Sequence, residues 1–399
     1  MKANLNIKSL TPKNYSLQNI SKKNKNKKLI REELKKIINN KHNFFKEQYH
    51  FSFKKNELKK YTKFKTIVVI GMGGSILGAK AIYTLMKHKI KKKVLFFDNL
   101  SENNIRIFNK KKNNKNNLFI IISKSGNTIE TLCNVNFLKK AKFCKKNTII
   151  ITEKKSSALA RFAKNMKILT IEHKKNIGGR FSILTEVGMV PALLMGLNID
   201  KFKLDFTKHL KTNEKMIQKN ILETSEIYLS KKINSLILLN YNTKLKNISY
   251  WLQQLLAESL GKNGKGLLPI VSSAPKDHHS LLQLYLDGPR DKIFYILDIK
   301  NIYKINSKNN YFKKELPFLS NKSLEKIVNS QKNAFTKTLK DKKIPYRIIN
   351  LNTCTEQTLG YFFSYFMLET IILGKIMGVN PYDQDAVEKV KILTKKNLT

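Results

Sequence analysis

Cysteine is scarce in this chain of 399 residues, which contains only Cys133, Cys144 and Cys354. The three residues are widely separated and form no Cys-x-x-Cys pair, which excludes a disulfide framework and a paired Cys/His zinc finger. There is also no His-Glu-x-x-His motif and no His, Asp or Glu cluster with the spacing of metal ligands, so we expect no metal site. Scattered, reduced thiols are typical of the cytosol.

Long apolar runs are missing as well. The first eight residues, Met-Lys-Ala-Asn-Leu-Asn-Ile-Lys, do not lead into the apolar core of a signal peptide. No apolar run approaches the roughly 20 residues that are needed to span a bilayer. We therefore expect a cytoplasmic protein without a membrane partner.

Acidic residues are few, since 28 Asp and Glu stand against 77 Lys and Arg, for a net charge of +49. Such a charge fits a nucleic acid, an anionic membrane surface or acidic substrates. However, Lys and Asn are spread over the whole chain, and no nucleic-acid-binding motif is present. An AT-rich coding sequence, which over-uses Lys, Asn and Ile, explains this pattern more simply, and we expect no nucleic-acid partner.

The order of the apolar segments predicts an α/β fold. The chain length suggests two or three domains. From residue 66 onward, short apolar strands alternate with helices, which is typical of parallel sheets covered by helices on both faces. The expected strands lie at 66–70, 94–97, 118–123, 148–152, 168–172, 236–240, 267–271, 292–298 and 346–351.

These strands divide into two similar units. We expect a helical N-terminal arm at 1–60, on the basis of helical spacing at 29–47, a first unit at 61–200 and a second unit at 201–399. Residues 201–232 are expected to form one long connecting helix. Helix 356–377 and a last basic helix, which ends near Lys396, complete the second unit.

A glycine-rich loop follows the first expected strand, where parallel sheets bind ligands. It reads Gly-Met-Gly-Gly74-Ser75-Ile76-Leu-Gly over residues 71–78. Ile76 occupies the third glycine position of a G-x-G-x-x-G dinucleotide motif, so the loop suits a single phosphate better. A tight turn without a ligand is the alternative.

A second loop, Ser123-Lys124-Ser125-Gly-Asn-Thr128, follows the third strand. Its hydroxyl groups, its glycine and the positive end of the following helix are suited to binding an anion. An ordinary Ser/Thr helix cap is the alternative.

Three further residues could carry the chemistry. Arg180 follows two glycines and could hold a substrate oxygen or a developing oxyanion, or form a surface ion pair. Glu258 lies late on an apolar helix, where burial would raise its pKa toward that of a general base; a surface glutamate is the alternative. His279 follows His278 on a neighbouring loop and could move protons or serve as a core histidine.

Taken together, these residues resemble the glucose-6-phosphate isomerase family, in its short bacterial branch. The family's motifs keep their order over roughly residues 66–391, and the ordered set is highly specific. They appear as Gly-x-Gly-Gly-Ser-x-x-Gly at 71–78, the phosphate loop at 123–128, Gly-Gly-Arg-x-Ser at 178–182, Glu-Ser-x-Gly-Lys at 258–262, Asp-x-His-Ser with a downstream Gln at 277–283, and Asn-Pro-x-Asp-Gln…Val-Glu-x-x-Lys at 380–391.

The resemblance implies two SIS (sugar isomerase) domains, each a doubly wound parallel sheet in a three-layer α/β/α arrangement. It also implies a homodimer whose active site lies between domains and subunits. The reaction would interconvert D-glucose 6-phosphate and D-fructose 6-phosphate through an enediolate, in glycolysis and gluconeogenesis, without a cofactor. A non-catalytic phosphosugar-sensing SIS protein is the alternative.

The resemblance assigns a role to each matching residue. Glu258 would move the proton between C1 and C2, and His279, working in the partner's site, and Lys391 would assist ring opening. Two departures stand out: Asp385-Ala386 replaces the family's Pro-Gly, which could shift Lys391, and His278 replaces an apolar residue. The residues that would bind substrate are Gly74, Ser75, Ser123, Lys124, Ser125, Thr128, Arg180 and Gln384.

Overall fold

The first unit contains a sheet of five parallel strands in the order β3-β2-β4-β5-β6. The computed structural model describes residues 5–12, 15, 19–39, 49–110, 116–300, 305 and 311–398. The strands are β2 (Thr66–Gly71), β3 (Lys93–Phe97), β4 (Asn117–Ile122), β5 (Thr148–Thr152) and β6 (Leu169–Glu172). The strand order reverses between β2 and β4, so the loops that follow these two strands border the crevice where doubly wound sheets bind ligands.

Helices cover both faces of this sheet, which explains why its strands are continuously apolar. Ile67 and Val69 of β2 face one core, and Val68 and Ile70 face the other. On the first face the sheet packs against α3 (Leu77–Met86) and α7 (Glu186–Leu194). On the second face it packs against α4 (Glu102–Lys110), α5 (Ile129–Phe137) and α6 (Ala158–Asn165).

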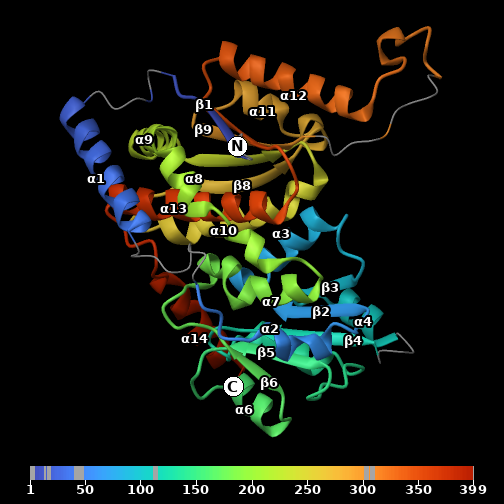
Figure 1. Cartoon of the computed structure of the whole chain (residues 1–399). Coiled ribbons are helices and arrows are strands. Elements are labelled where there is room, and N and C mark those ends of the chain that lie inside the picture. Colours follow the sequence, from blue (N-terminus) through green and yellow to red (C-terminus); the bar gives the residue numbers. More distant parts are fainter. Residues whose placement is uncertain are drawn as a thin grey trace.

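The second unit repeats this plan. Its sheet has the order β1-β10-β9-β7-β8, and four of its strands are parallel. These strands are β7 (Ser235–Asn240), β8 (Leu268–Ser273), β9 (Lys292–Ile299) and β10 (Tyr346–Leu351). Helices α11 (Leu282–Asp287) and α12 (Leu324–Asp341) cover one face, and Figure 1 shows them at the top of the molecule. The predicted fold class, with two doubly wound parallel sheets, is confirmed.

The N-terminal segment contains a strand as well as a helix. Helix α1 spans Ile20–Ile38, but β1 (Leu5–Leu10) pairs antiparallel with β10 at the edge of the second sheet. The expectation of a purely helical arm did not include this strand, whose Leu5 and Ile7 are buried while the residues between and after them are more exposed. Residues 40–47 of the expected arm helix lie outside the described residues.

The expected single helix over 201–232 is wrong. The segment forms α8 (Phe206–Thr212) and α9 (Glu214–Leu229), which meet at Asn213. Asn213 leaves the helical conformation with a ψ of 17°, and its side-chain amide donates to the carbonyl of His209. A local side-chain bond of this kind competes with continuation of the helix.

Two long helices connect the units. Helix α13 (Glu356–Met377) is the one helix in the described part of the chain that has the length and apolarity of a membrane span, but 89% of its apolar window is buried in the fold. It packs against α10 (Lys246–Leu260), where Trp251 lies 4.9 Å from the ring of Phe363. Helix α10 also contacts α3 of the first unit, as Figure 1 shows. The C-terminal end of α10, which carries Glu258, therefore lies between the two units.

Candidate active site

Arg180 is the centre of the site and joins three distant segments of the chain. It lies on the 3-10 helix Gly179–Leu184 and is 1% exposed, so the alternative of a surface ion pair is wrong. Its Nε donates to Ser259 Oγ at 2.8 Å, and its Nη1 lies 3.3 Å from Glu258 Oε2 and 3.2 Å from Gln384 Oε1. Burial lowers the pKa of Arg180, and the nearby Glu258 carboxylate opposes that change.

The glycine loop packs directly against the segment that carries Arg180. A Cβ atom on Gly74 would lie 2.2 Å from the carbonyl carbon of Gly179, so no larger residue fits there. Gly73 has a φ of 51°, and a Cβ on it would lie 2.8 Å from Gln254 Nε2. Ser75, at the end of this turn, is buried. The loop therefore fits closely between Arg180 and α10, which explains its glycines.

Glu258 is held between two donors but stays open to solvent. Arg180 approaches one carboxylate oxygen, and Gln254 Nε2 donates to the other at 2.8 Å. The Glu258 side chain is 31% exposed, so it lies between the buried carboxylate and the surface glutamate that the sequence left open, and a ligand can reach it. Gln254 was not predicted as a site residue, although its position one helical turn before Glu258 places both side chains on one face of α10.

The hydroxyl groups of the second loop form a compact cup at the start of α5. Ser123 Oγ lies 2.8 Å from Thr128 Oγ1, and Ser125 Oγ lies 3.4 Å from the same atom. Thr128 is at the helix cap position but makes no side-chain capping bond, which disfavours the reading as an ordinary cap. Gly126 has a φ of 70°, and a Cβ there would lie 2.1 Å from Ser157 Oγ. Three hydroxyls at a helix N-terminus have the geometry and chemistry that suit an anion.

Lys124 lies beside this cup but its ammonium group is directed to a neighbouring loop. Its Nζ donates to the carbonyl of Lys175 at 2.8 Å and lies 3.6 Å from Glu153 Oε1. Burial lowers the pKa of Lys124, and Glu153 opposes that change. Lys124 therefore adds positive charge next to the cup without contacting its hydroxyls.

The two adjacent histidines have different environments. His278 Nε2 lies 3.2 Å from the hydroxyl of Tyr241, and its ring packs 5.2 Å from that of Phe335, so His278 is the structural member of the pair. Asp277 anchors the turn, because its carboxylate accepts from Ser272 Oγ at 2.8 Å and from a backbone N–H. His279 is exposed and has no hydrogen bond or ion pair within the described part of the chain. The chain alone does not join it to Arg180 or Glu258.

Lys391 also lies apart from the site. It is on α14 (Glu388–Leu398), where its Nζ donates to Glu388 Oε1 at 2.6 Å. Both side chains are about 60% exposed, at 60% and 61%, and α14 has no buried residue. Of the predicted catalytic residues, the structure thus brings only Glu258 together with the predicted substrate-binding Arg180 and Gln384.

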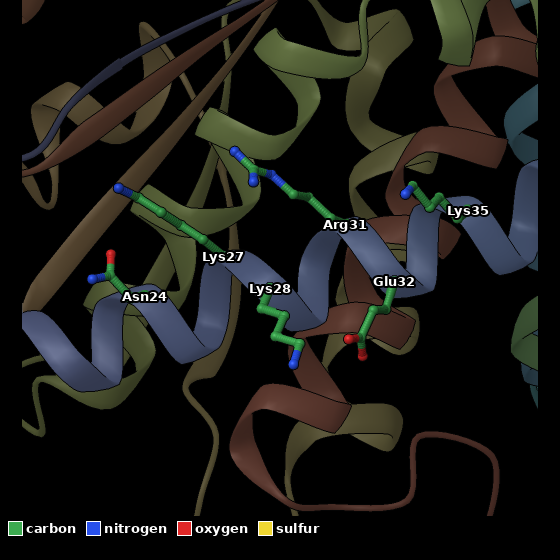
Figure 2. A pocket seen from close by; sticks show the side chains of 6 residues that line it. All are labelled: Asn24, Lys27, Lys28, Arg31, Glu32 and Lys35. Atoms are coloured by element: carbon green, nitrogen blue, oxygen red, sulfur yellow. The ribbon is translucent and has the colours of Figure 1, made fainter.

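A separate hollow lies on α1, and Figure 2 shows that its side chains do not converge. Lys27 and Arg31 point to one side of the helix, while Lys28 and Glu32 point to the other. All the lining residues come from this one helix: Asn24, Lys27, Lys28, Arg31, Glu32 and Lys35. The hollow shares no residue with the site around Arg180.

The arrangement around Arg180 can hold an anion and move a proton nearby. The hydroxyl cup and the glycine loop follow β4 and β2, which are neighbouring strands, and the carboxylate of Glu258 stands beside a buried guanidinium. In the described ranges, no group of three or more His, Cys, Asp or Glu residues is placed to hold a metal ion.

Two doubly wound parallel sheets in one chain define the SIS-type fold. A hypothetical protein from Thermus thermophilus has this fold, with a TM-score of 0.83 at 22% identity, covering 98% of this chain and 100% of its own. A glucose-6-phosphate isomerase from Chlamydia trachomatis also has it, with a TM-score of 0.70 at 20% identity, covering 85% of this chain and 71% of its own.

Comparison with related sequences identifies the family within this fold. Residues 10–399 match the phosphoglucose isomerase family. The chain is 34% identical over 354 residues to the glucose-6-phosphate isomerase of Campylobacter jejuni, covering 84% of this chain and 85% of the relative. It is 32% identical over 346 residues to that of Methanocaldococcus jannaschii, covering 84% and 85%. The chain belongs to the phosphoglucose isomerase family, and it is an aldose–ketose isomerase.

Proposed function

We propose that the chain interconverts D-glucose 6-phosphate and D-fructose 6-phosphate, with Glu258 as the base and Arg180 as the electrostatic stabiliser. The observation that carries this proposal is the 3.3 Å approach of Arg180 Nη1 to Oε2 of Glu258, a carboxylate that is 31% exposed. An aldose–ketose exchange needs one base that removes a proton from C2 and returns it to C1. It also needs a cation near the enediolate oxygen, where charge develops.

The remaining residues bind the substrate. The hydroxyls of Ser123, Ser125 and Thr128 hold the phosphate at the N-terminus of α5, with the charge of Lys124 beside them. Gly74 and Ser75 line the sugar, and Gln384, which contacts Arg180, reaches the substrate from the tail. In this role the enzyme serves glycolysis and gluconeogenesis in the cytosol.

A phosphosugar sensor without turnover is not favoured. A sensor needs the hydroxyl cup but has no use for a carboxylate held between two donors. The names of the relatives from Campylobacter jejuni and Methanocaldococcus jannaschii also indicate catalysis.

The direct test is conversion of fructose 6-phosphate to glucose 6-phosphate by purified protein, treated with a chelator and without added cofactor. We expect turnover under these conditions, because Glu258 and Arg180 supply the proton transfer and the charge stabilisation. Binding of fructose 6-phosphate without any turnover would overturn the proposal in favour of the sensor.

We further infer a homodimer in which each subunit supplies His279 to the site of the other. The exposed position of His279, without a bond inside the described part of its own chain, supports this arrangement. The tail helix α14 also presents apolar side chains to solvent, with Val390 66% and Ile392 67% exposed, and a second copy would cover them.

Mixing inactive variants tests the sharing of sites. We expect His279→Ala and Glu258→Gln proteins, each nearly inactive alone, to regain about a quarter of wild-type activity after their subunits are exchanged. After exchange, half of the dimers contain one subunit of each variant. In each of these mixed dimers, one of the two sites has both Glu258 and His279 intact.

The matched control is a mixture of Arg180→Lys and Glu258→Gln proteins. These two residues belong to one site in one chain, so no mixed dimer contains an intact site and no activity returns. Mixed dimers of the His279→Ala and Glu258→Gln proteins that stay inactive would show that His279 does not act across the interface.

A further inference from the structure

Two cations from different parts of the chain hold the loop 380–384 against the active site. Arg180 Nη2 donates to the carbonyl of Pro381 at 2.5 Å and to that of Asp383 at 2.8 Å. Lys262 Nζ donates to the same Asp383 carbonyl at 2.8 Å, to the Asp383 carboxylate and to the carbonyl of Asn380. The ion pair with Lys262 lowers the pKa of Asp383. The loop therefore receives most of its polar contacts from one lysine and one arginine.

This loop is the last part of the chain with strong contacts to the body of the protein. The ring of Tyr382 packs 5.6 Å from that of Phe181, but beyond it Gln384 is exposed and α14 has no buried residue. The contacts of Lys262 with the loop 380–384 consequently determine the position of Gln384. They also determine the direction in which the tail that carries Lys391 leaves the site.

The loop also fixes the orientation of Arg180. Its Nη2 group donates to the carbonyls of Pro381 and Asp383, and Nη1 consequently faces Glu258 and Gln384. If the loop shifted, a buried guanidinium would lose two acceptors and would turn to find others, because unsatisfied buried donors are costly.

We propose that Lys262 and Asp383 are positioning residues that hold Arg180 in its productive orientation by clamping the loop 380–384. This inference rests on the proposed function, since it assumes that Arg180 stabilises the enediolate. Neither residue touches the substrate; both act through the carbonyl groups that bind Arg180. Lys262 is suited to this role because it contacts both the loop backbone and the Asp383 side chain.

The first experiment replaces Lys262 with methionine, which keeps the apolar stem and removes the ammonium group. We expect kcat for fructose 6-phosphate to fall about 100-fold, the cost of a small misplacement of a catalytic group. KM should change less than about threefold, because the hydroxyl cup at 123–128 is untouched. Lys262→Arg should stay within about threefold of wild-type kcat, since it restores a cation at this position.

A neighbouring lysine provides the matched control. Lys265 Nζ donates to the carbonyl of Met377 at 2.8 Å, at the C-terminal end of α13, and makes no contact with the loop 380–384 among the described bonds. We expect Lys265→Met to keep wild-type kcat. An equal loss of kcat in Lys265→Met and Lys262→Met would overturn the proposal, as would an unchanged kcat in Lys262→Met.

Ligand binding separates positioning from general damage. A hydroxamate phosphate that mimics the enediolate should bind Lys262→Met about 100-fold more weakly, while inorganic phosphate binds as it does to the wild type. Equal weakening of both ligands would overturn the proposal. If Lys262→Met does not fold, Asp383→Ala replaces it in the test. We then expect kcat to fall about tenfold and the affinity for inorganic phosphate to stay unchanged.

The outcome also distinguishes this inference from the proposed function. An active wild type, an inactive Glu258→Gln protein and a fully active Lys262→Met protein would reject the clamp alone. A wild type without turnover would reject the proposed function itself.

Discussion

Glu258→Gln lowers kcat about 10⁴-fold and leaves sugar-phosphate binding nearly intact: this is the largest effect that we expect on activity. The amide has almost the same shape as the carboxylate, but it cannot take the proton from C2. It also cannot accept from both of its present donors, because Arg180 and Gln254 each approach a different oxygen of Glu258. The hydroxyl cup lies in the loop between β4 and α5, apart from α10, and keeps its contacts. Steady-state kinetics and binding of fructose 6-phosphate measure the two effects separately.

Two further variants separate the loss of the base from loss of phosphate binding and from loss of any carboxylate. Ser125→Ala combined with Thr128→Ala should mainly raise KM, because these hydroxyls hold the phosphate in both the ground state and the transition state. Glu102→Gln removes a carboxylate from the exposed pair with Arg106 on α4 and should leave both constants unchanged. Full activity of Glu258→Gln would show that another group is the base.

The largest expected effect on stability comes from a pair far from the chemistry. Arg347 on β10 and Glu369 on α13 form two hydrogen bonds, of 3.0 and 2.9 Å, and their side chains are 2% and 1% exposed. Tyr365 donates to the same carboxylate at 3.1 Å. Burial alone would lower the pKa of Arg347, but Glu369 raises that pKa well above its ordinary value. The guanidinium therefore remains charged inside the core.

We expect Glu369→Gln to lower the free energy of unfolding by about 3–5 kcal/mol, because it leaves a buried charge without its counter-charge. Urea unfolding at fixed protein concentration measures the difference. Glu102→Gln again serves as the control, since exposed ion pairs on a helix add little. If Glu369→Gln lowers the free energy of unfolding no more than this control does, the buried pair does not stabilise the contact between β10 and α13.

The regular elements of the core could be predicted closely from the sequence. The bounds expected for β5, β10 and α13 agree with those of the structure, because continuous apolar segments end at polar or glycine-containing loops. Strand β1 was missed for a physical reason. Its residues are only partly apolar, and the partner that makes it a strand, β10, lies at the other end of the chain.

The family resemblance assigned Glu258, Arg180 and Gln384 to one site, and the structure brings them together. From the residues alone, the geometry of the site could be predicted only where local sequence determines it. Ser123, Ser125 and Thr128 are close in sequence, and they form the hydroxyl cup as expected from their spacing. The pairing of Arg180 with Glu258 depends on packing between units, which no local pattern encodes. The same holds for Lys262, whose contacts with the tail loop follow from the docking of distant segments.

The pairing of β1 with β10 has a consequence for synthesis of the chain. Leu5 pairs with Leu351, so β1 leaves the ribosome before a partner that is made roughly 340 residues later. At about 5–20 residues per second this delay is roughly 17 to 70 seconds. During that time the first sheet, whose strands all lie between residues 66 and 172, can already assemble. The newborn chain thus carries β1 without its partner while the first sheet folds, and the second sheet is complete only after β10 has been made.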